Sequence, residues 1–220
     1  MHVSVNELDA QIRRAARGAG MSWGGAEEAG RAARRLASHG FDIADRLAEL
    51  LERRFIDALG DPGGEIVLRR NALSGSSGIS DPLQLGPVLC DHAFLIEEQG
   101  SVRVAMVAHP ILLLPFILNA PVLRGASLEI SWPGAGMVID RARFDPGTCR
   151  ELDALAQADW VDFAWTGETM QPRQHRLAWL GVEIDPLTWK RLDRLSGRTY
   201  VPASEQSRKR GAGAGNIDND

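Results

Sequence analysis

The C-terminal segment, residues 199–220, combines residue types that bind small anions. It holds two serines and the basic run Arg-Lys-Arg, followed by alternating glycines and an aspartate-rich end. Backbone N–H groups beside cationic side chains can form an anion site, and glycines allow the backbone to approach a ligand closely. We expect this segment to complete a ligand site. The expected ligand-binding residues are Ser204, Ser207, Arg208, Arg210, Gly211, Gly213 and Gly215. The alternative is a solvated chain end, which is common for polar termini.

Three other side chains are candidates for catalysis. His109 follows an apolar strand pattern, at a point where a base or an anion contact can emerge from a sheet. Cys90 and His92 share one face of an expected strand, where an imidazole would stabilise a thiolate. Each also has a structural interpretation, as a partly buried cysteine or a hydrogen-bonded histidine. The histidines show neither an HxH pattern nor an i,i+4 pair, so we expect no metal site.

Composition limits the classes of partner. The chain has 220 residues, 44% of them hydrophobic, which is enough for a substantial core. A net charge of −4 argues against general binding to nucleic acid or anionic membranes. Two cysteines without metal or disulfide spacing, and a start that lacks the pattern of a signal peptide, predict free thiols in the cytoplasm. The most apolar run, residues 111–118, is too short to span a bilayer.

The first 60 residues have the pattern of three helices. Ser4 and Glu7 form a capping-box pattern, and Ser22 and Asp42 are positioned to cap the next two helices. Apolar residues follow each cap at helical spacing, and glycines mark the helix ends.

The hydrophobic period changes after residue 61. Strand patterns cover residues 66–68, 89–97, 102–108, 126–132, 137–144 and 160–166. Gln99-Gly100 predicts a hairpin, and residues 109–120 predict a short buried helix or irregular segment. Thr148 and Glu151 form another capping-box pattern, and Asp185-Pro186 begins a last helix.

These patterns predict an α+β fold in which an N-terminal three-helix unit packs on a mostly antiparallel sheet, with late helices and a glycine-rich C-terminal segment. The expected divisions are a helical subdomain at 1–60, an α+β core at 61–198 and the C-terminal segment at 199–220.

Three segments resemble a bacterial family of about 200 residues whose function is not assigned. They are residues 16–30 (ARGAGMSWGGAEEAG), residues 107–116 (VAHPILLLPF) and the tail that ends in TYVPASEQSRKRGAGAGNIDND. The tail is the most specific of the three. Since the family has no assigned activity, this resemblance implies no reaction.

Residues 4–51 are also similar to the N-terminal helices of the type 2 malate/L-lactate dehydrogenase family, which implies NAD(P) chemistry on small acids. That family has Gly-Ile-Asp-Ser-His-Gly after its second helix and takes a catalytic histidine from it. Here Gly40 and Asp42 match, but Ile43 and Ala44 replace the serine and the histidine. The similarity therefore implies a shared helical module rather than shared catalysis.

Three functional hypotheses follow. The first is a cytoplasmic protein of organic or amino acid metabolism, an enzyme subunit or small-anion binder whose C-terminal segment completes a site. The second is a divergent NAD(P)-dependent oxidoreductase, and the third a non-catalytic assembly partner. The expected partner is a small anionic metabolite or a partner enzyme chain, with a homo-oligomer also open. Neither nucleic acid nor membrane is expected, and no cofactor is assigned.

Overall fold

The computed structural model describes residues 1–56, 66–75, 78–120, 126–139, 144–169 and 181–200. Its helices are α1 (Val5–Gly18), α2 (Trp23–Ser38), α3 (Ala44–Phe55), α4 (Pro82–Asp91), α5 (Phe94–Gln99), η1 (Pro110–Leu113), α6 (Leu114–Ile117), α7 (Arg150–Asp153), α8 (Pro186–Ser196) and η3 (Gly197–Thr199). Its strands are β1 (His2–Val3), β2 (Ile66–Arg69), β3 (Ala72–Gly75), β4 (Ser101–Ala108), β5 (Ala126–Trp132), β6 (Ala135–Ile139), β7 (Gln157–Thr169) and β8 (Val182–Glu183).

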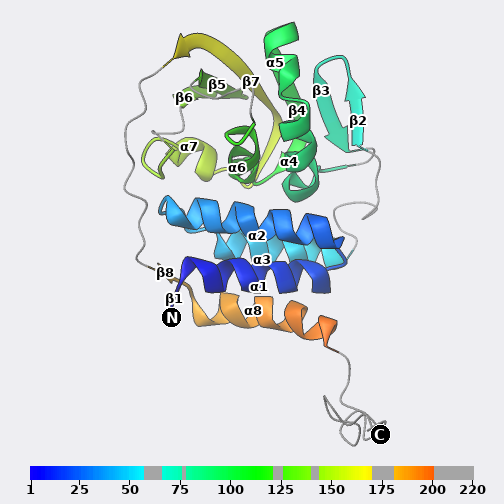
Figure 1. The fold of residues 1–220 in the computed structure, drawn as a ribbon, viewed down its shortest axis with the longest axis vertical. Helices are drawn as coiled ribbons and strands as arrows, with labels where there is room; N and C mark the ends of the chain where they lie inside the picture. The colour runs from blue at the N-terminus through cyan, green and yellow to red at the C-terminus, as the bar shows by residue number, and fades with distance from the viewer. Residues whose placement is uncertain (57–65, 76–77, 121–125, 140–143, 170–180, 201–220) are drawn as a thin grey trace, which may run out of the picture.

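Helices α1, α2, α3 and α8 form one layer, and the larger sheet with its own helices lies above it (Figure 1). We call these the helical layer and the α/β layer. The three expected N-terminal helices are present, and α8 joins them by packing against α1 and α3. The short strands β1 and β8 pair antiparallel, so the N-terminus lies beside the start of α8.

The larger sheet has six strands in the order β2-β3-β4-β7-β5-β6. Its pairs are antiparallel except for β3 and β4, which run parallel. Together with the helical layer, this sheet confirms the predicted α+β class and its mostly antiparallel character. Strand β7, which lies between β4 and β5, comes from late in the chain.

Local signals account for most helix boundaries. The Ser4–Glu7 capping box is formed, the Ser22 hydroxyl accepts a hydrogen bond from the N–H of Gly25, and Asp185 caps α8. Two predicted caps are wrong. Helix α3 begins after Ile43 without a side-chain cap, and Thr148 hydrogen-bonds to the Asp145 carboxylate instead of capping α7.

The predicted strand at residues 89–97 is wrong, because this stretch belongs to α4 and α5. Asp81 starts α4 by accepting a hydrogen bond from the N–H of Leu83 at 2.8 Å, and Pro82 occupies the first helical position. Gly100, with φ of 84°, ends α5 in the left-handed region. The predicted Gln99-Gly100 hairpin is therefore a helix end, and the hairpin lies instead between β2 and β3.

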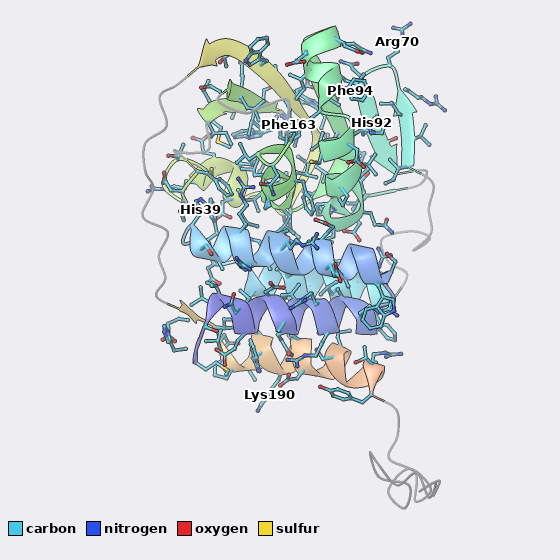
Figure 2. The ribbon with its side chains drawn as sticks, viewed as in Figure 1. His39, Arg70, His92, Phe94, Phe163 and Lys190 are labelled. Carbon is cyan, nitrogen blue, oxygen red and sulfur yellow. The ribbon has the colours of Figure 1, made fainter. Side chains whose placement is uncertain are left out.

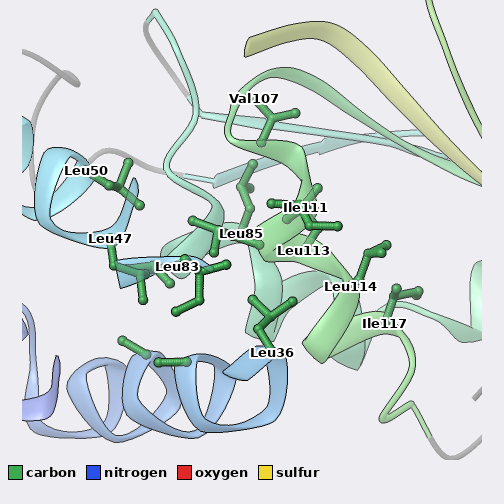
Figure 3. Close-up of a cluster of buried hydrophobic side chains, with 14 of the residues drawn as sticks. Leu36, Leu47, Leu50, Leu83, Leu85, Val107, Ile111, Leu113, Leu114 and Ile117 are labelled. Carbon is green, nitrogen blue, oxygen red and sulfur yellow. The ribbon is translucent and has the colours of Figure 1, made fainter. Parts of the chain in front are cut away.

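One apolar core joins the two layers. Leu36 and Leu47 of the helical layer face Leu83 and Leu85 of α4 and Ile111 of η1 (Figure 3). The run from residue 110 to 117 is helical and buried, in agreement with the short buried helix or irregular segment predicted at 109–120. No helix of the described residues is both long enough and apolar enough to cross a membrane.

Candidate functional site

A groove of about 680 Å³ lies where the end of α1, the first turn of α2 and η3 meet. Its lining residues are Ala10, Arg13, Arg14, Arg17, Gly18, Gly20, Trp23, Ala26, Glu27, Arg198 and Thr199. We call it the arginine groove. Four guanidinium groups line it, against the single carboxylate of Glu27.

The turn between α1 and α2 shapes this groove. Helix α1 ends at Gly18, and Gly20 follows with φ of 89°, a conformation that favours glycine. Ser22 then caps α2, so that the first turn of α2 forms one wall. The N-terminal end of a helix carries partial positive charge, which favours an anion there.

The arginines of the groove differ in how they are held. The Arg13 Nε lies 3.0 Å from the Asp9 carboxylate, and the Arg14 guanidinium donates to the Gln11 side-chain oxygen at 2.8 Å. The Arg17 guanidinium donates to a backbone carbonyl and stacks 4.4 Å from the centre of the Trp23 ring. The Arg198 guanidinium lies 3.6 Å from the centre of the Phe55 ring.

Three of these cations have no carboxylate partner within the described part of the chain: Arg14, Arg17 and Arg198. The Glu27 carboxylate that lines the groove is itself paired with Arg31, at 3.1 Å. The Trp23 indole is 73% exposed, which is unusual for so large an apolar ring. The groove therefore offers unneutralised cations beside an accessible aromatic surface.

His109 is the catalytic candidate with the most unusual surroundings. It is 4% exposed, and its backbone lies in the left-handed region with φ of 39°. Its Nε2 is 3.5 Å from the Glu49 carboxylate, and neither ring nitrogen has a hydrogen-bond partner among the described residues. Burial lowers the pKa of the His109 imidazole, and Arg46 and Arg53 lower it further, against the opposing effect of Glu49.

Cys90 is the second-to-last residue of α4, and His92 follows the helix as its C-cap. They lie at the end of a helix, where residues two apart point to different sides, rather than on one face of a strand. The His92 ring is 2.8 Å from the Val88 carbonyl and 6.0 Å from the Phe94 ring. His92 and Phe94 lie high in the α/β layer, away from the helical layer (Figure 2).

The ligand-binding residues expected in the tail lie outside the described residues. They are Ser204, Ser207, Arg208, Arg210, Gly211, Gly213 and Gly215. The chain enters this segment from Arg198 and Thr199, which line the arginine groove. No group of three or more possible metal ligands occurs within the described ranges.

Sequence reasoning missed the arginine groove, because its parts are far apart in the chain. Arg13, Arg14 and Arg17 recur at helical spacing on α1, which is a signal for one cationic face. Nothing in the sequence places Arg198 beside them, since that contact depends on how α8 packs.

Comparisons with known proteins give a match at the N-terminal end. Residues 3–78 match the family model described as "Protein of unknown function (DUF3726)". This confirms the expected resemblance to a family of unassigned function over the three N-terminal helices and the β2–β3 hairpin. The matched range includes the segment at 16–30 but not those at 107–116 or in the tail.

Among solved structures, the chain is similar to malate dehydrogenase from Entamoeba histolytica. The identity is 13% and the TM-score 0.43, and the similarity covers 59% of this chain and 38% of that chain. The chain thus spans well under two thirds of that protein's length, and a likeness at this level carries no argument about chemistry. No curated protein matched the chain.

Proposed function

We propose that the protein binds a small anionic metabolite, with a carboxylate or phosphate group, in the arginine groove. It would act in organic or amino acid metabolism, as an enzyme subunit or as a ligand-binding protein. The observation that carries the proposal is the convergence of Arg14, Arg17 and Arg198 on one groove without a carboxylate partner among the described residues.

Electrostatics favours an anion in this position. Like charges three or four residues apart on a helix destabilise it by about 0.2–0.5 kcal/mol per pair, and Arg13, Arg14 and Arg17 form two such pairs. A bound oxyanion would offset this repulsion and accept paired hydrogen bonds from the planar guanidinium groups. The positive end of α2 would add to the attraction.

The tail provides the second part of the proposal. Because Arg198 and Thr199 line the groove, the residues that follow them start at its edge. We propose that Arg208 and Arg210 add further contacts to the anion, with the Ser204 and Ser207 hydroxyls as hydrogen-bond donors. In this arrangement the tail would complete the site begun by α1, α2 and η3.

Titration calorimetry with inorganic phosphate and with succinate, at matched ionic strength, tests the groove. The variants are Arg14→Gln and Arg17→Gln, and Arg150→Gln is the control, an exposed arginine of the α/β layer. Since Arg14 lies at the rim, we expect its loss to cost about 1 kcal/mol, or roughly fivefold in Kd. The control should bind like the wild type.

The same experiment separates ligand binding from a purely structural role of the arginines. Arg17 lies in the last turn of α1, where a cation stabilises the helix without any ligand. If neither anion binds, or if all three variants bind equally, the groove is not an anion site. A chain truncated after Tyr200 that binds like the full chain would remove the tail from the site and leave the groove in place.

A further inference from the structure

His109 combines three features that rarely occur together. It is buried, its ring nitrogens lack hydrogen-bond partners among the described residues, and its backbone has φ of 39° and ψ of 65°. Left-handed backbone at a residue other than glycine is strained, and such residues cluster at functional sites. An unpaired buried polar group adds a further cost. His109 in this conformation therefore lowers the stability of the folded protein.

The ring lies at the junction of the two layers. His109 follows β4 and precedes η1 in the α/β layer, whereas Glu49 belongs to α3 of the helical layer. Two further ion pairs cross the same junction. Arg46 of α3 pairs with Asp153 of α7, and Arg54 of α3 pairs with Asp81 at the start of α4, at 2.8 Å.

The charged groups around His109 have a net charge of zero while its ring is neutral. The facing groups on α3 are Glu49, Arg46 and Arg53. Glu49 also pairs with Arg53, and Arg46 pairs with Asp153, so the set has two cations and two anions. A proton on His109 would add a fifth, uncompensated charge at a buried position.

We propose that His109 is a proton-sensitive position where the helical layer meets the α/β layer beside Glu49: the layers stay packed while the imidazole is neutral and loosen when it is protonated.

Loosening is the expected direction because, among the described residues, the imidazolium has no counter-ion that it does not share. Glu49 is shared with Arg53, and both Arg46 and Arg53 repel a cation on the ring. The pKa of His109 is lower in the folded protein than in the unfolded chain. The pH-dependent part of the stability is therefore fully present above about pH 6.5, the usual pKa of histidine, and is lost as the pH falls through the folded value.

Hydrogen exchange followed by mass spectrometry tests this contact. Protection factors would be compared at pH 7.5 and 5.5 for α3 and for residues 105–114. The variants are His109→Asn, which tolerates left-handed backbone and cannot titrate, and the matched control His92→Asn. In the wild type and in the control, protection at the junction should fall several-fold at pH 5.5. In His109→Asn it should not change with pH.

Two results would overturn the proposal. One is an equal loss of protection in His109→Asn, and the other is an NMR titration in which the His109 ring has a pKa of about 6.5 or above. If His109→Asn does not fold, Glu49→Gln provides the second variant. Removing that carboxylate disfavours the imidazolium, so the loss of protection should move to lower pH. A transition that does not move would also contradict the proposal.

Discussion

The contact between α1 and α8 allows a sharp test of how the arginine groove is built. Gly18 ends α1, and a Cβ atom added there would lie 1.8 Å from the Leu195 carbonyl oxygen of α8. Carbon and oxygen atoms normally approach no closer than about 3.3 Å. The substitution Gly18→Ala therefore requires the two helices to separate by roughly 1.5 Å. Because the added Cβ is fixed to the backbone of α1 and the atom that it meets is a backbone oxygen of α8, no side-chain rotation can relieve the overlap.

We expect Gly18→Ala to destabilise the protein by about 1–3 kcal/mol, the usual cost of an extra methyl group in a packed interface. The higher helix propensity of alanine offsets this by at most about 1 kcal/mol. For a chain of this size, each kcal/mol lowers Tm by about 2–4 °C. The displaced α8 also moves Arg198, so binding of phosphate or succinate should weaken as well.

Gly24→Ala is the matched control. Gly24 lies in the first turn of α2, and a Cβ atom there would meet nothing within 4 Å. We expect this variant to be as stable as the wild type or slightly more stable. Urea unfolding of the three proteins gives the comparison. If Gly18→Ala unfolds at the same urea concentration as Gly24→Ala, α8 does not pack on α1 as described.

Three further predictions concern the α/β layer. Phe116→Ala should lower the free energy of unfolding by about 3–5 kcal/mol, measured from urea midpoints, because the ring is buried in the core. Burial raises the pKa of the Cys149 thiol to about 12. Iodoacetamide at pH 8 should therefore modify Cys90 in the folded protein and Cys149 only in urea; equal rates of Cys149 modification with and without urea would contradict this. Asp81→Ala should cost about 3–5 kcal/mol in thermal unfolding, because it breaks the buried Arg54–Asp81 ion pair and removes the cap of α4. An unchanged Tm would show that the pair is not buried.

The sequence was most informative where structure depends on neighbouring residues. The Ser4–Glu7 capping box and the Asp185 cap are contacts within one helical turn, and both are formed as predicted. The strand assigned to 89–97 was wrong because an apolar run of this length fits a buried helix as well as a strand. The deciding signals were the cap at Asp81 and the left-handed Gly100, which flank the run.

The order of the strands was beyond local reasoning. Strand β7 lies between β4 and β5 in the sheet, although it follows both β5 and β6 in the chain. Its register pairs Val104 with Val161 and Ile130 with Phe163, which places buried side chains on the helix-covered face. Such pairings depend on the packed core of the whole chain rather than on any one segment.

The arginine groove likewise depends on packing between segments that are far apart in the chain. Helix α8 is held by the Arg191 guanidinium, 2.9 Å from Glu52 of α3, and by the Asp193 carboxylate, which accepts a hydrogen bond from Gln11 of α1 at 2.6 Å. These contacts place η3, which contains Arg198, beside the C-terminal end of α1. The η3 turn that follows α8 thus adds a guanidinium to the three on α1 and places the start of the tail beside them. The tail is cationic in its middle and acidic at its end. On the proposed function, its arginines contact the bound ligand. When the ligand is absent, its carboxylates pair instead with the arginines of the groove.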